Sequence, residues 1–82
     1  MPKTGPLHSN LKKYLKKRNL QKKFNKQIKL LRQDVNHPSL HTEILEPRKL
    51  RIFSFRIDKK YRAIFIYRKG EIEIIDINPH YE

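Results

Sequence analysis

The sequence predicts an α+β domain, in which an N-terminal helical hairpin packs on a small antiparallel β-sheet of three to four strands connected as a meander. Two observations predict this class. Apolar residues recur at helical spacing in the first forty residues, whereas three runs of alternating or β-branched residues follow residue 50. Because the helices precede the strands in the chain, we expect them to cover one face of the sheet.

Two short amphipathic helices account for the N-terminal half. Ser9 or Asn10 can cap the first helix, and Asn19 can cap the second. The apolar stripe of the first helix is Leu11, Tyr14 and Leu15. That of the second helix is Leu20, Phe24, Ile28 and Leu31, widened by Leu30. We expect both stripes to face the sheet and the lysines between them to face solvent.

Three strands are predicted in the C-terminal half. They follow a loop at His37-Pro38-Ser39 and a short extended segment over residues 42–45 that ends before Pro47. The strands cover residues 51–57, 61–67 and 71–77, and the second is expected at the centre of the sheet. Residues 58–60 and 68–70 are predicted as three-residue turns, and Gly70 suits a left-handed backbone position.

We expect a single domain over residues 1–82, with residues 1–8 as a flexible N-terminus, because two prolines and a glycine make this segment a poor strand. The longest apolar run, residues 63–67, is too short to span a membrane, and no secretory segment follows Met1, so a cytoplasmic protein is expected. The lack of cysteine excludes disulfides, cysteine-ligated zinc and cysteine nucleophiles.

No cofactor or metal is expected. His37 and His41 are four residues apart, but Pro38 argues against the helix that would align them as ligands.

The charge of the chain is strongly positive and unevenly distributed. The 82 residues hold 20 Lys and Arg against 8 Asp and Glu, a net charge of +12. Residues 1–40 hold eleven of the basic residues and one acid, whereas residues 41–82 are nearly balanced. Nine cations lie in the predicted hairpin: Lys12, Lys13, Lys16, Lys17, Arg18, Lys22, Lys23, Lys26 and Lys29. This excess predicts a polyanionic partner.

Two arginines are predicted to face each other on the sheet. If both turns are three-residue loops, Arg56 lies across from Arg62, and Arg62 also lies across from Asp76. Like charges in this position are destabilising unless something neutralises them. Two interpretations remain open: a structural network with Asp76 or a nearby glutamate, or a phosphate site, since guanidinium groups match phosphate oxygens.

Three further residues could complete an RNA-cleaving set. Glu43 lies in the short segment before the sheet, and His80 and Tyr81 follow the last strand. A carboxylate can take the proton of a 2′-hydroxyl, arginines can stabilise the phosphorane charge, and a histidine can protonate the leaving 5′ oxygen. A tyrosine can stack on a base.

Five segments occur in a characteristic order: His37-Pro38-Ser39-Leu40-His41-Thr42, Phe53-Ser54-Phe55-Arg56-Ile57, Tyr61-Arg62-Ala63-Ile64-Phe65, Asp76-Ile77 and His80-Tyr81. Together they resemble the RelE/ParE toxin superfamily, and most closely its RelE/YoeB-type mRNA interferases. The resemblance implies a RelE/ParE-like fold and the toxin of a type II toxin–antitoxin pair, with a cognate antitoxin as partner. It also implies an endoribonuclease that enters the ribosomal A site, on the small subunit of the ribosome, where it cuts mRNA.

The resemblance also assigns roles to individual residues. Arg62 matches the arginine that contacts the scissile phosphate, and Arg56 matches a basic position of the same site. His80 and Tyr81 match a terminal His-Tyr pair in which histidine is the acid, and Glu43 falls at the spacing of the general base. The expected RNA-binding residues are Lys12, Lys13, Lys16, Lys49 and Arg51.

The chain departs from the family pattern at two places. Phe53 stands where the family usually has tryptophan, and the first strand of many members is expected to be missing here. Two alternative functions stay open: a ParE-like inhibitor of DNA gyrase, and a non-catalytic RNA- or ribosome-binding module. The acid/base set of Glu43, His80 and Tyr81 favours the nuclease, because a gyrase inhibitor does not need it.

Overall fold

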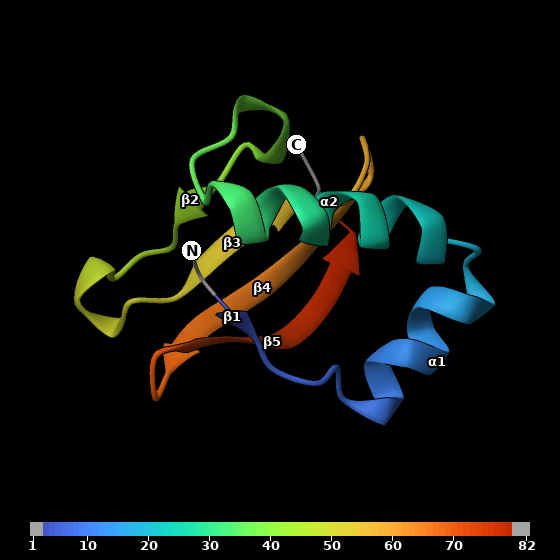
Figure 1. The fold of residues 1–82 in the computed structure, drawn as a ribbon, viewed down its shortest axis with the longest axis horizontal. Coiled ribbons are helices and arrows are strands. Elements are labelled where there is room, and N and C mark those ends of the chain that lie inside the picture. Colours follow the sequence, from blue (N-terminus) through green and yellow to red (C-terminus); the bar gives the residue numbers. More distant parts are fainter. Residues whose placement is uncertain (1–2, 80–82) are drawn as a thin grey trace.

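The computed structural model describes residues 3–79 and shows two helices packed on one face of a five-stranded sheet (Figure 1). The helices are α1 (Ser9–Lys17) and α2 (Gln21–Gln33), with two short 3-10 helices, η1 (Pro38–Leu40) and η2 (Arg48–Leu50). The strands are β1 (Lys3–Thr4), β2 (Glu43–Ile44), β3 (Phe53–Arg56), β4 (Tyr61–Arg68) and β5 (Glu71–Pro79). Their order in the sheet is β1-β5-β4-β3-β2, which confirms the α+β class and the central position of β4.

The N-terminal segment corrects the predicted strand count. Lys3 and Thr4 pair in parallel with Glu71 and Ile72 of β5, and the N–H of Gly5 donates to the Ile72 carbonyl at 2.9 Å. The expectation of a missing first strand is therefore wrong, and the sheet is mixed rather than purely antiparallel. The prolines do not prevent this pairing, because it uses only two residues and ends before Pro6.

The ends of the two helices differ from the predicted caps. His8 precedes α1 without a side-chain cap, so Ser9 lies inside the helix. Asn19 ends α1 rather than capping α2: its φ is 56°, and its N–H donates to the Lys16 carbonyl. The N–H of Leu20 donates back to Leu15 at 2.9 Å. This pair of bonds is a Schellman motif, which favours a residue that tolerates the left-handed conformation, as asparagine does.

The predicted cap at Asn10 is also wrong, because this residue is the second residue of α1.

The hydrophobic core lies between the helices and the sheet. The helices and the residue before α2 contribute Leu11, Leu15, Leu20, Phe24, Ile28 and Leu31, all buried as predicted, with Tyr14 and Leu30 partly buried beside them. The sheet contributes Phe55, Ile57, Ala63, Phe65, Ile72, Ile74 and Ile77. Because alternate residues of β3 and β4 fill this core, the intervening residues occupy the opposite face of the sheet.

The β4–β5 hairpin corrects the predicted register. Its loop consists of two residues, Lys69 and Gly70, whose φ angles of 52° and 78° are typical of a type I′ turn. A β-bulge follows at Ile75, because Phe65 pairs with Ile74, whereas the preceding residue of β4, Ile64, pairs with Asp76. The shorter loop and the bulge together place Asn78, not Asp76, across from Arg62.

The β3–β4 turn has the predicted length and is closed by Asp58. The Asp58 carboxylate accepts hydrogen bonds from the N–H of Tyr61 at 2.8 Å and of Lys60 at 2.9 Å. Its other oxygen contacts the Lys23 ammonium of α2 at 3.3 Å. Burial alone would raise the pKa of Asp58, but these backbone N–H groups and Lys23 hold the pKa below its ordinary value.

None of the helices formed within residues 3–79 is long and apolar enough to cross a lipid bilayer.

Candidate functional site

Three of the five predicted catalytic residues share one face of the sheet. Arg56 at the end of β3 pairs directly with Arg62 on β4, as the sequence predicts. Glu43 on β2 pairs with Ser54, which precedes Arg56 by two residues on β3. Directly paired residues, and residues two apart on a strand, point to the same side of a sheet. Glu43, Arg56 and Arg62 therefore lie together on the face opposite the helices.

Arg62 is held in place by neutral groups. The residue is 5% exposed, and its Nε donates to the Ser54 hydroxyl at 3.1 Å. Its Nη2 donates to the carbonyl oxygens of Ser54 at 3.3 Å and of His41 at 2.5 Å. His41 adopts a left-handed conformation with φ 46° at the end of η1. This arrangement fixes the guanidinium group without neutralising its charge.

The electrostatics of the site favour an anion. Burial lowers the pKa of Arg62, the negative charge of Glu43 opposes this effect, and the positive charge of Arg56 adds to it. An arginine nevertheless stays protonated at neutral pH. Within residues 3–79, no carboxylate forms an ion pair with Arg56 or Arg62. The face thus presents two guanidinium groups and one carboxylate, a balance that suits a phosphate.

Asp76 does not neutralise the arginines. One of its oxygens accepts a hydrogen bond from the Ile77 N–H at 2.9 Å, and the other accepts one from the Asn78 amide at 3.1 Å. The register explains this: the bulge moves Asp76 to the position across from Ile64. The sequence left open whether Asp76 neutralises the two arginines in a structural network. In the part of the chain described, Asp76 forms no ion pair with either arginine.

The other two predicted catalytic residues, His80 and Tyr81, lie outside the described residues. The described chain ends beside the start of β4, because Asn78 pairs with Arg62 and Pro79 pairs with Tyr61.

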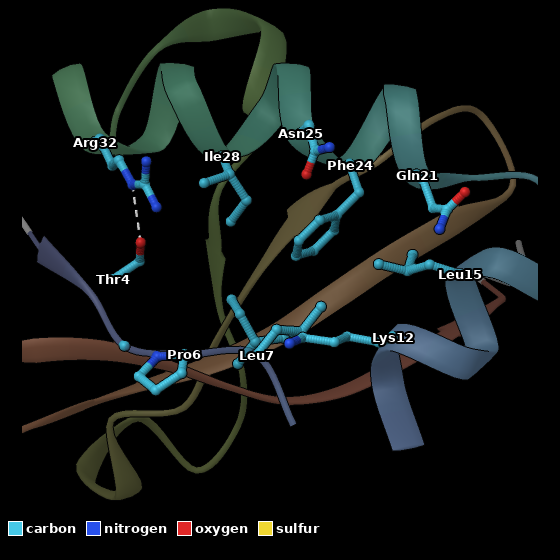
Figure 2. A pocket seen from close by; sticks show the side chains of 12 residues that line it. Thr4, Pro6, Leu7, Lys12, Leu15, Gln21, Phe24, Asn25, Ile28 and Arg32 are labelled. Atoms are coloured by element: carbon cyan, nitrogen blue, oxygen red, sulfur yellow. Dashed lines mark hydrogen bonds between the residues drawn. The ribbon is translucent and has the colours of Figure 1, made fainter. Parts of the chain in front are cut away.

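The predicted RNA-binding residues lie elsewhere. Lys49 and Arg51 belong to η2 and its C-terminal end, next to the start of β3, whereas Arg56 ends that strand. Lys13 and Lys16 are exposed on α1. Lys12 lines a groove of about 440 Å³ between α1, α2 and the N-terminal segment (Figure 2). The structure therefore does not gather these cations around the arginines.

The groove in Figure 2 belongs to the helix side of the molecule. Leu15, Phe24 and Ile28 form much of its apolar wall, and the Arg32 guanidinium donates to the Thr4 hydroxyl at 2.8 Å. The residues that line it include no acid and neither of the two paired arginines. It is thus separate from the face that carries Glu43, Arg56 and Arg62.

One polar residue of the site was not anticipated from the sequence. Gln27 is buried in the apolar stripe of α2, and its amide donates to the carbonyl oxygens of Ser39 at 3.0 Å and of Arg56 at 2.7 Å. The signal that could have found it is its spacing, three residues after Phe24 and four before Leu31.

No group of three or more His, Asp or Glu side chains within residues 3–79 is placed to hold a metal ion.

Comparison with known proteins identifies the fold. No family model matches the chain. An uncharacterized protein of Haemophilus influenzae is 40% identical over 43 residues, which is 52% of this chain and less than half, 43%, of that protein. A YoeB/ParE toxin from Agrobacterium tumefaciens superimposes with a TM-score of 0.72 over 99% of this chain and 100% of its own, at 17% identity. The YoeB dimer structure from Staphylococcus aureus gives a TM-score of 0.71 over 96% and 94%, at 21% identity. The chain has the YoeB/ParE-like fold that its motifs implied.

Proposed function

We propose that this protein is the toxin of a type II toxin–antitoxin pair and an endoribonuclease that cuts mRNA in the ribosomal A site. One observation carries the proposal: Arg56 and Arg62 face each other beside Glu43, and no carboxylate of the described chain forms an ion pair with either arginine. Two unneutralised guanidinium groups next to a carboxylate are the groups that cleavage of a phosphodiester bond in RNA requires. The fold shared with YoeB/ParE toxins supports the same function.

The proposed reaction uses each residue in a distinct role. Glu43 accepts the proton of the 2′-hydroxyl, and the 2′ oxygen attacks the adjacent phosphorus. Arg56 and Arg62 stabilise the negative charge that develops on the phosphoryl oxygens. His80 protonates the departing 5′ oxygen, so that the bond to phosphorus breaks and a 2′,3′-cyclic phosphate remains. Tyr81 stacks on a base beside the cut.

The burial of Arg62 supports this role for it. A guanidinium group that is fixed by Ser54 and the His41 carbonyl does not have to reorganise when charge develops on a phosphate. Arg56, directly across the strand pair, supplies a second positive group to the same position.

The exposed cations would bind RNA more broadly. Lys12, Lys13 and Lys16 on α1, with Lys49 and Arg51 near η2, can contact phosphates of ribosomal RNA or mRNA without reading sequence. A cognate antitoxin would be expected to counter this positive charge with an acidic segment.

The proposal is tested in a translating extract. Addition of the protein should produce cuts in mRNA at ribosome-occupied codons, read by primer extension. Glu43→Gln should reduce the cleavage rate by at least about 100-fold, because the 2′-hydroxyl loses its base. Glu71→Gln is the matched control. Glu71 is an exposed glutamate at the start of β5, where it lies across the strand pair from Arg68 and away from Glu43.

Other results would contradict the nuclease function or one of its assigned roles. Translation that stops while the mRNA stays intact would point to a binding module, and Glu43→Gln protein that cuts as fast as the unmodified protein would remove the proposed base. Inhibition of DNA supercoiling by gyrase, in the absence of any mRNA cutting, would instead support the ParE-like alternative.

A further inference from the structure

Gln27 connects the helix layer to both arginines of the site. The residue is 6% exposed and lies on the face of α2 that packs against the sheet. The two hydrogens of its amide nitrogen are both used, because Nε2 donates to the Ser39 carbonyl at 3.0 Å and to the Arg56 carbonyl at 2.7 Å. One side chain thereby holds two segments that lie far apart in the sequence.

Both acceptors belong to segments that carry the site. Arg56 is itself one of the two paired arginines. Ser39 lies in η1, two residues before His41, whose carbonyl oxygen accepts a hydrogen bond from Arg62. Gln27 therefore fixes the backbone of one arginine and the loop that orients the other.

An amide is an unusual choice at this position. Burial of a polar group costs free energy unless it is hydrogen-bonded, and an apolar side chain would match the neighbouring Phe24, Ile28 and Leu31. A buried amide with defined partners instead selects one arrangement of the segments that it joins. Here it selects the arrangement of η1 relative to the end of β3.

Ser54 has the complementary role on the sheet. The residue is 2% exposed, and its hydroxyl accepts the hydrogen bond from Arg62 Nε at 3.1 Å. Because Nε lies at the base of the guanidinium plane, this bond sets the rotation of the plane. The Ser54 carbonyl also accepts a bond from Nη2, so a single residue contacts two nitrogens of the group.

We infer that Gln27 and Ser54 are positioning residues of the phosphate site, Gln27 by holding the Arg56 backbone and the η1 loop, and Ser54 by orienting the Arg62 guanidinium. The inference rests on the proposed phosphate-binding role of Arg56 and Arg62. Neither Gln27 nor Ser54 touches the phosphate. Each keeps donors in the geometry that phosphate needs, so that binding requires no rearrangement.

Phosphate titration followed by nuclear magnetic resonance tests Gln27. The Nε–H signals of Arg56 and Arg62 are recorded as inorganic phosphate replaces chloride at constant ionic strength. Gln27→Met removes both hydrogen bonds at similar volume and should weaken phosphate binding at these two signals by at least about fivefold. Gln33→Met is the matched control, since Gln33 is the exposed last residue of α2, and it should change binding by less than about twofold.

A second pair of variants tests Ser54 and remains decisive if Gln27→Met does not fold. Ser54→Ala should speed hydrogen exchange of the Arg62 Nε–H by about tenfold or more, and Ser54→Thr, which restores the hydroxyl, should return it close to the original rate. The measurement is made well below the unfolding temperature of each variant. Because loss of the hydroxyl exposes this N–H whatever the role of Ser54, phosphate affinity is measured on the same two variants. Ser54→Ala should weaken phosphate binding by at least about fivefold and Ser54→Thr should restore it, whereas a purely structural role would lower the unfolding temperature and leave the affinity unchanged.

The outcomes separate the inference from the proposed function. Suppose that the unmodified protein binds phosphate at the two arginines and cuts no mRNA, and that Gln27→Met weakens phosphate binding. The positioning roles then hold and the nuclease function fails. If it cuts mRNA, while Gln27→Met and Ser54→Ala both leave phosphate affinity and cleavage rate within about twofold, the inference is wrong and the function stands. Arginine signals that do not respond to phosphate would overturn the positioning roles, and the proposed function would fail as well only if the unmodified protein also cut no mRNA.

Discussion

The lysines of the helices and the arginines of the sheet carry the same charge in opposite physical settings. On α1 and α2 the cations are exposed, as for Lys13 and Lys16, and even Lys23, which contacts Asp58, keeps 59% of its side chain exposed. On the sheet, Arg62 is 5% exposed and makes three hydrogen bonds to neutral groups.

The number of positive charges and the position of each charge therefore have different effects on binding. Exposed cations are screened by salt and can substitute for one another, so they set the strength of attraction to a polyanion. A buried guanidinium group with fixed partners cannot move to suit a ligand, so it sets a geometry. The helical hairpin should therefore respond to salt and tolerate substitution, whereas Arg62 should do neither.

The largest expected effect is on the sheet. Arg62→Ala should reduce mRNA cleavage by at least about 100-fold, or about 3 kcal/mol of transition-state stabilisation, because a fixed donor to the phosphate is lost. Arg62→Lys should be nearly as slow, because lysine keeps the charge but lacks the Nε bond to Ser54. Primer extension with stalled ribosomes measures both.

Arg68→Ala is the control for this prediction, since Arg68 ends the same strand but is exposed. Equal losses from Arg62→Ala and Arg68→Ala would mean that charge alone matters. Thermal unfolding of each variant is needed as well, because Arg62→Ala also leaves the buried Ser54 hydroxyl without its donor, at a cost of about 1–3 kcal/mol.

A smaller effect is expected on the helices. The double variant Lys13→Ala, Lys16→Ala should weaken binding to ribosomes by up to about tenfold at low salt and lower the slope of log affinity against log salt by about 1–2. Binding over a series of potassium chloride concentrations measures this slope. Because Lys13 and Lys16 are exposed, unfolding should not change. An unchanged slope would remove α1 from the proposed RNA-binding surface.

The Asp58 turn gives a stability effect that depends on pH. Its pKa is lowered in the folded protein from a starting value of 3.8, so its contribution is present above that value and is lost as the pH falls through the folded pKa. Asp58→Asn should lower the free energy of unfolding by about 1 kcal/mol near neutral pH. The difference between the two proteins should vanish at about pH 2. Denaturant unfolding at both pH values measures it, and a constant difference would contradict the assignment.

The smallest effect is expected for Lys23→Ala. Lys23 contacts the Asp58 carboxylate at 3.3 Å, but its side chain is mostly exposed. Solvent-exposed pairs contribute about 0–1 kcal/mol, so the free energy of unfolding should fall by no more than about 0.5 kcal/mol. Chemical denaturation in low and high salt measures this. A larger loss would show that a lysine of the helical hairpin also has a fixed structural role.

The features that could be predicted from the sequence are those that periodicity encodes. The apolar stripes of both helices, the central strand and the Arg56–Arg62 pair follow from spacing and a three-residue turn. Pattern also places Glu43 in the short extended segment that pairs with β3. Each of these features follows from the regular spacing of apolar and polar residues within one segment of the chain.

The features that could not be predicted depend on single residues whose conformation or contacts are not indicated by the residues around them in the sequence. Lys69 gives no sign that it adopts a positive φ, so the β4–β5 loop is one residue shorter than predicted. Gln27 resembles any surface glutamine until η1 and β3 are placed beside it. The pairing of Lys3 and Thr4 depends on β5, which lies at the other end of the chain, and is invisible in their own segment.

The bulge at Ile75 has a consequence for how chains of this fold can change length. Ile72 and Ile74 face the core before it, and Ile77 faces the core after it. Deleting a residue from a regular strand reverses every later side chain, but here the deletion of Ile75 would leave Ile74, Asp76 and Ile77 in strict alternation. A chain one residue shorter at this point could therefore keep Asn78 across from Arg62, so alignments of related sequences should place a gap at Ile75 rather than in the turn.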